Sequence, residues 1–403
     1  MARVPITLKH IEIVNLRGFA RLKLDFATVT GPYVVIGKNG TCKTTLLRAV
    51  AAVLGHGRGA SQLLNRAGSL IGHTKPVKIN AKFYGAGDPF TFRIDDGILV
   101  FASRTEAFSG GAFVCAYGVS RFFSGADTSV SPGYAFEDAT ATLFNVPRPL
   151  TEPELTIRRL KDLLYESTFN AMWKSLERLI GLSNGQSILV VPGGGLKIQG
   201  PNNEQHDFHS WADGHRITFT WILDFFAQAM KADAFDAEGN ICGVLLVDEI
   251  EQHLHPSMQL EILPKLQALL PKCQIIVTTH SPLVALSVPS DNVISLQRQA
   301  DGSIVRVPTP DLTGYSAEDV LVHPNLFDAP AQTHETENAR EVFKAAMIDA
   351  TLSEQRLGPT SQDAFGLASV TLSKPSRNRL AEVDPELDAA LKEVLAAAKA
   401  SSL

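Results

Sequence analysis

Residues 37–46, GKNGTCKTTL, nearly match the phosphate-binding loop pattern of Gly, four residues, Gly, Lys and then Ser or Thr. Gly37, Lys43 and Thr44 fall in register, whereas Cys42 stands where the pattern has its second glycine. In such a loop backbone N–H groups bind phosphate oxygens, the lysine reaches the β- and γ-phosphates, and the threonine hydroxyl ligates Mg²⁺. The pattern predicts a nucleotide site built from the loop residues: Gly37, Lys38, Asn39, Gly40, Thr41, Cys42, Lys43, Thr44 and Thr45.

Two other segments carry groups suited to the same chemistry. GVLLVDE (243–249) places Asp248 and Glu249 after a short apolar run, at the strand end where ligands bind in open α/β sheets. We expect Asp248 to hold a magnesium ion through a water, and Glu249 to orient or deprotonate the attacking water. IIVTTHSP places His280 after the next apolar run, where it could donate a hydrogen bond to a γ-phosphate. Each feature alone is common in a structural role, but the three in this order predict a nucleotide-hydrolysing site.

A sheet must position these groups, and the hydrophobic pattern predicts one. Apolar runs typical of buried strands alternate with helical patterns, which predicts a mostly parallel sheet covered by helices, an α/β fold. The predicted strands lie at 33–37, 77–84, 90–101, 112–118, 241–249 and 274–281, with hairpins over 10–26 and 187–200. The predicted helices lie at 43–55, 151–181, 217–230, 257–270 and 384–402. We interpret 124–150 as a loop or linker, the chain after 301 as rich in loops, and 355–383 as poorly ordered.

The composition is that of an ordinary globular protein, with 45% hydrophobic and 20% charged residues in a chain of 403. A net charge of −5 argues against a uniformly basic nucleic-acid-binding coat, although not against a local basic face. Residues 49–87 hold five basic residues and no acidic one, a pattern more often found in a solvated loop. Four scattered cysteines and the lack of a long apolar run predict a cytoplasmic protein without disulfides, a zinc site or a membrane span.

Together the motifs resemble those of ABC-type ATPases of the RecF/SMC/OLD-like group. IEIVNLRGF is similar to that group's opening strand, GKNGTCKTTLL to its Walker A, LLVDEIEQHLHP to its Walker B and D-loop, TTHSP to its H-loop, and WADGHR (211–216) to its signature segment. The resemblance implies an ABC-ATPase head with a mostly parallel sheet, an antiparallel β subdomain and a helical insertion. We accordingly divide the chain into a first ATPase lobe (1–123), a loop and helical insertion (124–204), a second ATPase lobe (205–300) and a C-terminal extension (301–403).

The resemblance also implies a head-to-head dimer, or a higher oligomer, that encloses ATP and magnesium between Walker A of one subunit and Asp213, Gly214 and Arg216 of the other. Gly214 would let backbone approach a phosphate closely, at a helix N-terminus that favours anions. The chain departs from the family pattern at Ala212, which replaces the signature serine. No glutamine marks a Q-loop after 112–118, where the chain has instead Tyr117, Ser120 and Arg121. An alternative metal site in the D-loop would use His253, His255 and Glu251.

Cys42 bears on whether the site works. The glycine before the P-loop lysine commonly has a left-handed backbone, in which a Cβ costs about 1–2 kcal/mol. A thiol beside the phosphates could also obstruct the β-phosphate. Because about 1.4 kcal/mol is tenfold in an equilibrium constant, we expect Cys42 to weaken nucleotide binding without abolishing it.

The motifs predict an ATPase that converts ATP to ADP and phosphate. The sequence has no nuclease motif and no long coiled-coil arm, so we expect the effector to be a separate protein. Such a compact ATPase resembles the ATPase subunits of bacterial antiphage systems of the Septu type or associated with retrons. We therefore predict a switch whose nucleotide-dependent dimerisation controls an effector such as a nuclease. The alternatives are a DNA-repair-type ATPase that binds nucleic acid through 49–87, and a scaffold whose nucleotide site is impaired by Cys42.

Overall fold

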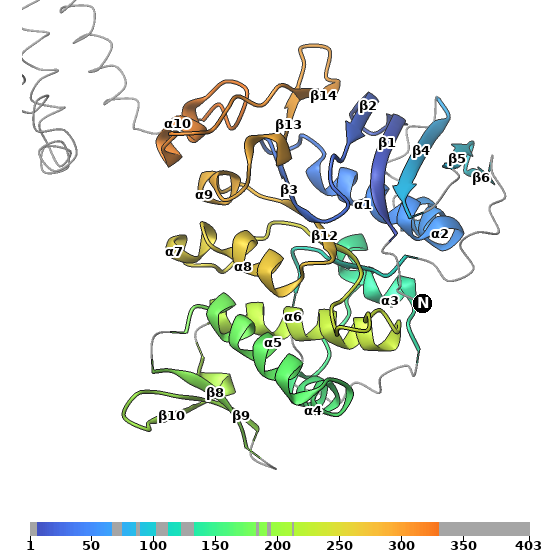
Figure 1. Ribbon diagram of the computed structural model, residues 1–403. Coiled ribbons are helices and arrows are strands. Elements are labelled where there is room, and N and C mark those ends of the chain that lie inside the picture. Colours follow the sequence, from blue (N-terminus) through green and yellow to red (C-terminus); the bar gives the residue numbers. More distant parts are fainter. Residues whose placement is uncertain are drawn as a thin grey trace, which may run out of the picture. The chain divides into compact units, whose positions relative to one another are not determined.

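The computed structural model describes residues 6–66, 75–85, 89–101, 112–121, 133–182, 185–191, 195–211 and 213–329. The chain divides into two units, residues 1–328 and 329–403. All elements below belong to the first unit (Figure 1). The predicted helix over 384–402 and the predicted poorly ordered stretch at 355–383 lie outside the described residues. No helix in the described part of the chain is both long and apolar enough to cross a membrane.

A six-stranded sheet has the order β14, β13, β3, β12, β11, β7. Its strands are β3 (Gly31–Ile36), β7 (Val114–Tyr117), β11 (Gly243–Val247), β12 (Cys273–Thr278), β13 (Val293–Arg298) and β14 (Ile304–Val307). The strands run parallel except β14, which pairs antiparallel with β13. Every residue of β3, β7, β11 and β12 is buried, as expected for strands covered on both faces. The predicted mostly parallel sheet is confirmed.

A second sheet is antiparallel, with the order β2, β1, β4, β5, β6. Its strands are β1 (Thr7–Leu16), β2 (Phe19–Asp25), β4 (Val77–Tyr84), β5 (Phe90–Asp95) and β6 (Ile98–Phe101). Buried and exposed residues alternate along β4 and β5, so only one face meets the core that also contains α1 (Lys43–Leu54) and α2 (His56–Arg66). The Gln274 side chain joins the two sheets by bonding both backbone groups of Leu8 (2.8 and 2.9 Å). The predicted hairpin over 10–26 and antiparallel subdomain are confirmed.

The helical part contains α4 (Pro153–Leu163), α5 (Glu166–Leu179), α6 (Asp213–Lys231), α7 (Pro256–Gln259) and α8 (Ile262–Leu269). α4 packs against α6, and α5 against α8 (Figure 1). A three-stranded antiparallel sheet, β8 (Ser187–Val191), β9 (Gly195–Gln199) and β10 (Gln205–Asp207), contains the predicted hairpin and adds a strand. The remaining elements are α3 (Phe136–Ala139), η3 (Ala141–Phe144), η4 (Phe208–Ser210), α9 (Pro282–Leu286), η5 (Ser290–Asn292) and α10 (Ala317–Val322).

Four predicted segments differ from the structure. The strand predicted over 90–101 is the hairpin of β5 and β6, because the chain turns at Asp96 and Gly97, which both have positive φ. The helix predicted over 151–181 is two helices, because the backbone is extended at Leu164 and Tyr165. The helix predicted over 257–270 breaks at Leu260, whose carbonyl a continuous helix would bring against the ring of Pro264. The loop predicted at 124–150 contains α3 and η3 in its described part.

Candidate nucleotide-binding site

The loop at residues 37–42 connects the end of β3 to the start of α1, which is the strand–loop–helix order that the motif requires. Gly37 has φ +148°, and a Cβ there would lie 2.4 Å from the Leu296 carbonyl oxygen. Gly40 has φ +78°, and among the described residues a Cβ there would face the Arg298 side chain alone, at 3.7 Å. Arg298 Nη2 donates to the Gly40 carbonyl oxygen at 2.7 Å. Gly37 and Gly40 thus leave the backbone without a Cβ at two points of the loop, where a phosphate can approach the N–H groups closely.

Lys43 is buried at the first position of α1, and its ammonium lies inside the loop. Nζ donates to the carbonyl oxygens of Gly37 (2.7 Å) and Lys38 (3.3 Å). Burial lowers the pKa of Lys43, while the nearby carboxylates of the Asp248 segment oppose that shift. A positive charge is therefore available where the motif predicts the phosphates.

The Asp248 carboxylate, which follows β11, connects the first turn of α1 to the end of β12. Its Oδ2 accepts from Thr44 Oγ1 at 2.7 Å, and its Oδ1 accepts from Thr278 Oγ1 at 2.5 Å. Asp248 is only 3% exposed. Hydroxyl and carboxylate oxygens are the ligands that Mg²⁺ prefers, so these residues suit a magnesium nucleotide.

Glu249 and His280 follow the ends of β11 and β12. Glu249 has φ +48°, a left-handed conformation, and its N–H donates to Thr278 Oγ1 at 2.8 Å. The His280 N–H donates to Glu251 Oε1 at 2.6 Å, and burial together with the Lys43 ammonium lowers the pKa of His280. The structure thus gathers the predicted Walker A, Asp248, Glu249 and His280 at one edge of the sheet.

The alternative metal site is not assembled. Glu251 is used by Thr279, whose hydroxyl donates to Oε2 at 2.7 Å, as well as by His280. His255 Nδ1 is bonded to Ser257 and caps α7. Across the described ranges, no group of three or more His, Cys, Asp or Glu side chains could hold a metal ion.

The signature segment begins α6, a helix of 19 residues that starts at Asp213. A Cβ at Gly214 would lie 2.3 Å from the His253 carbonyl oxygen. From the sequence we expected Gly214 to allow close approach to a phosphate. In the structure, the contact with His253 already requires a glycine at this position. Arg216 is half-buried on the same turn, and Ala212 lies outside the described residues.

The backbone predicted for Cys42 is confirmed, at φ 61° and ψ 28°. The predicted position of its thiol beside the phosphates is wrong. Cys42 is 8% exposed and belongs to the hydrophobic core, with Sγ 3.4 Å from where a Cβ on Gly18 would stand. The thiol therefore packs under the β1–β2 turn, because the left-handed backbone directs the side chain into the core.

Several contacts of the site were missed from the sequence. Thr278 supports both Asp248 and Glu249, and Glu251 holds the His280 backbone. Arg121, in the place of a Q-loop glutamine, donates to the carbonyl oxygens of Asp248 and Glu249. The TT pair before His280 follows a buried strand and was the available signal for Thr278; nothing local indicated the other contacts.

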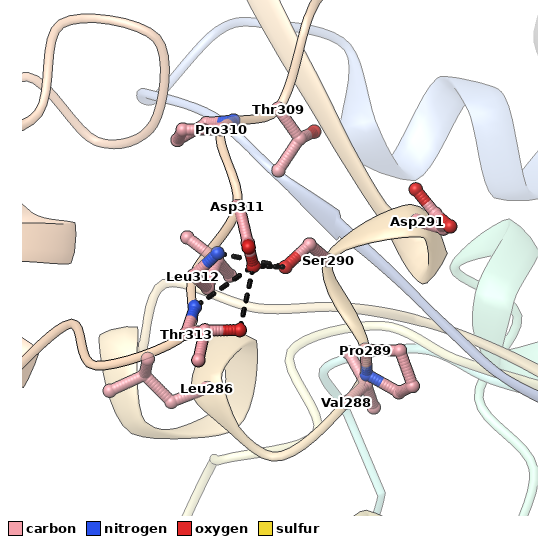
Figure 2. A pocket seen from close by; sticks show the side chains of 10 residues that line it. All are labelled: Leu286, Val288, Pro289, Ser290, Asp291, Thr309, Pro310, Asp311, Leu312 and Thr313. Atoms are coloured by element: carbon pink, nitrogen blue, oxygen red, sulfur yellow. Dashed lines mark hydrogen bonds between the residues drawn. The ribbon is translucent and has the colours of Figure 1, made fainter.

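A separate hollow of about 580 Å³ lies between residues 286–291 and 309–313 (Figure 2). Its Asp311 carboxylate accepts from Ser290 Oγ and from the N–H and hydroxyl of Thr313. None of the P-loop residues lines it. Its polar groups serve the fold of this turn, so the hollow is not part of the candidate site.

Comparison with known proteins agrees with the motifs. The family model "AAA domain, putative AbiEii toxin, Type IV TA system" matches residues 147–287. The Septu protein PtuA of Bacillus mycoides is 23% identical over 326 residues, which cover 78% of this chain and 44% of that protein. The "Retron Ec83 probable ATPase" of Escherichia coli is 34% identical over 135 residues, covering 32% of this chain and 24% of that protein. This chain therefore spans less than half the length of either relative.

A solved SMC head domain from Thermotoga maritima is 13% identical, with a TM-score of 0.46 over 75% of this chain and 99% of that one. A likeness this distant adds nothing to the argument from topology. The retron relative is named a probable ATPase, and the matching family model is described as an AAA domain, so both agree with use of a nucleotide at the site. By its motifs, their geometry and its sequence relatives, the chain resembles the ABC-type ATPases of the RecF/SMC/OLD-like group and, among them, those of bacterial antiphage systems.

Proposed function

We propose that the chain is an ATP-binding and ATP-hydrolysing switch whose nucleotide-dependent dimerisation controls a separate effector, such as a nuclease, in antiphage defence. The contact between Thr44 Oγ1 and Asp248 Oδ2, at 2.7 Å, is the observation that carries the proposal. It joins the P-loop helix to the carboxylate after β11. Few structural roles require a threonine in the first motif together with an aspartate in the second. The relatives support the same function, since they are a Septu protein and a retron protein named a probable ATPase.

The side chains take the following roles in this proposal. The P-loop amides and Lys43 would bind the phosphates, and Thr44 with Asp248 would hold Mg²⁺, which when bound neutralises charge on the phosphate oxygens. Glu249 would accept the proton of the attacking water. The lowered pKa of His280 favours a neutral imidazole near pH 7, which keeps one N–H for donation to a γ-phosphate.

In the proposed dimer, Asp213, Gly214 and Arg216 of one subunit face the P-loop of the other. Gly214 rests on the backbone of His253, so the signature segment and the D-loop would move as one body. A larger residue at Gly214 would therefore disturb the monomer as well as the interface. Arg216→Glu is the better test of the dimer, because it reverses a charge and leaves the close contact between Gly214 and the His253 backbone unchanged.

The experiment compares wild type with Lys43→Ala and Glu249→Gln by calorimetric titration with magnesium ATP, phosphate release and light scattering. We expect Lys43→Ala to lose ATP binding. Glu249→Gln should bind ATP, hydrolyse it at least about a hundredfold more slowly and accumulate as a dimer. Arg216→Glu should bind ATP and stay monomeric. If the wild type dimerises without regard to ATP and binds none, the scaffold interpretation replaces this proposal.

A direct DNA-binding role is the second candidate, favoured by one feature of the antiparallel sheet. Arg21, Lys78 and Arg93 are exposed on its outer face, and the strand register places them in one row across β2, β1, β4 and β5. Arg21 is paired with Glu12 and Arg93 with Asp95, which reduces their charge available to phosphates. This role predicts DNA-stimulated hydrolysis, and each of Lys78→Glu and Arg93→Glu should lower the salt slope of DNA binding by about one or more. DNA affinity that is unaffected by both substitutions would remove the candidate.

A further inference from the structure

Arg121 lies just beyond β7, and its guanidinium is buried behind the residues that follow β11. The residue is 6% exposed. Its Nη2 donates to the carbonyl oxygens of Asp248 (3.0 Å) and Glu249 (2.7 Å), and lies 3.4 Å from Oε1 of Gln252. All three acceptors are neutral. The positive charge of Arg121 therefore stabilises the backbone of the turn that bears the Asp248 and Glu249 carboxylates.

That turn needs support because Glu249 has φ +48°, a conformation that a side chain penalises. Thr278 holds its amide side: the hydroxyl accepts from Glu249 N–H at 2.8 Å, and the carbonyl oxygen accepts from Ile250 N–H at 3.1 Å. Arg121 holds its carbonyl side. Without the guanidinium, two successive carbonyl oxygens would lose a charged donor, and the turn could relax toward an ordinary conformation.

The electrostatic surroundings explain why an arginine occupies this place. Burial lowers the pKa of Arg121 to about 10, so it remains charged at neutral pH, and the carboxylates of Asp248, Glu251 and Glu249 favour that charge. A glutamine amide could also donate from one nitrogen to two carbonyl oxygens, but it would lack the charge that these carboxylates favour. Glu249 in turn lies within electrostatic range of Lys43 in the P-loop.

We propose that Arg121 is a positioning residue for ATP hydrolysis, which holds the left-handed turn at Glu249 so that its carboxylate stays beside the P-loop. The inference rests on the proposed function, because Arg121 acts through Glu249. It differs from a general stabilising role in one respect. Loss of Arg121 should slow the chemical step while leaving ATP binding intact.

The test compares Arg121→Met, Arg121→Lys and the matched control Arg148→Met, which removes another largely buried arginine, bonded to Asp224. We expect Arg121→Met to lower kcat about tenfold to a hundredfold, the effect of losing a charged hydrogen bond. Its Kd for magnesium ATP should change by less than about threefold, since the P-loop is untouched. Arg121→Lys should recover part of kcat, and Arg148→Met should lower Tm without the selective loss of kcat. In single turnovers of Glu249→Gln, adding Arg121→Met should cause no further slowing.

The inference is overturned if Arg121→Met keeps the wild-type kcat. It is also overturned if Arg121→Met slows the Glu249→Gln variant further, or if Arg148→Met loses kcat to the same extent. Should Arg121→Met fail to fold, Arg121→Lys and Arg121→Gln take its place in the same comparison. If the wild type hydrolyses no ATP, the proposed function fails, and hydrogen exchange at the Glu249 and Ile250 amides decides separately about Arg121. Faster exchange in the Arg121 variant than in Arg148→Met supports its hold on the turn, and equal exchange refutes it.

Discussion

Substituting Cys42 by glycine tests whether the strained backbone at this residue lowers the stability of the fold or the affinity for ATP. The left-handed backbone of Cys42 is built into the start of α1, since its carbonyl oxygen accepts from Leu46 N–H at 2.9 Å. Its thiol is packed in the hydrophobic core beneath Gly18. Both features belong to the fold. The strain should therefore lower the stability of the folded chain and leave the affinity for ATP nearly unchanged.

The contributions of Cys42→Gly to the free energy of unfolding nearly cancel. Glycine relieves about 1–2 kcal/mol of left-handed strain. It gives up about 1 kcal/mol from the buried CH₂–SH group, and about 0.5–1 kcal/mol from the greater freedom of a glycine in the unfolded chain. We expect the free energy of unfolding to change by less than about 1 kcal/mol, and the Kd for magnesium ATP by less than about threefold.

Calorimetric titration with magnesium ATP and urea unfolding check both numbers for wild type, Cys42→Gly and Cys42→Ala. Alanine is the matched control because it keeps the strained Cβ and removes only the sulfur. If glycine alone tightens ATP binding by about tenfold or more, the strain acts on the bound state, and the assignment of its cost to folding is wrong. If glycine and alanine both tighten binding, the sulfur obstructs the phosphates despite its packing in the core.

Three further predictions follow from buried contacts. Thr278→Val removes the hydroxyl that supports Asp248 and Glu249, and should slow hydrolysis by about tenfold or more in a phosphate-release assay. An unchanged rate would show that the turn is held without this hydroxyl. Asp224→Ala should cost about 3–5 kcal/mol in urea unfolding, because it leaves the Arg148 charge without this carboxylate; a loss below about 1 kcal/mol would contradict that reasoning. Burial lowers the pKa of His56 from 6.5 to about 4. In that range the unfolded chain binds the proton more readily, so Tm should fall as pH drops from 6.5 to about 4. His56→Asn, which tolerates the left-handed backbone there, should flatten this slope, and an unchanged slope would assign it to other groups.

The sequence predicted four strands of the mostly parallel sheet, β3, β7, β11 and β12, and the edge at which the site lies, but not β13 and β14. Continuous apolar runs identified β3, β11 and β12, and the parallel strands place the residues that follow them at a common edge. The helix boundaries were less predictable. The pattern over 257–270 remained amphipathic through Leu260, and only the effect of Pro264 on the preceding turn interrupts it.

Contacts made through backbone were the part of the site that sequence reasoning could not reach. Arg121 binds carbonyl oxygens, Glu251 binds the N–H of His280, and Gly214 rests on the carbonyl of His253. Every residue type offers these backbone groups, so no pattern of letters indicates which donor meets which acceptor. The register between β7, β11 and β12 decides the pairing. The same reasoning explains Cys42, because the direction of its thiol follows from φ and not from the chemistry of a cysteine next to a phosphate. A motif therefore predicts which groups react, whereas the residues that hold them in place must be found from the fold.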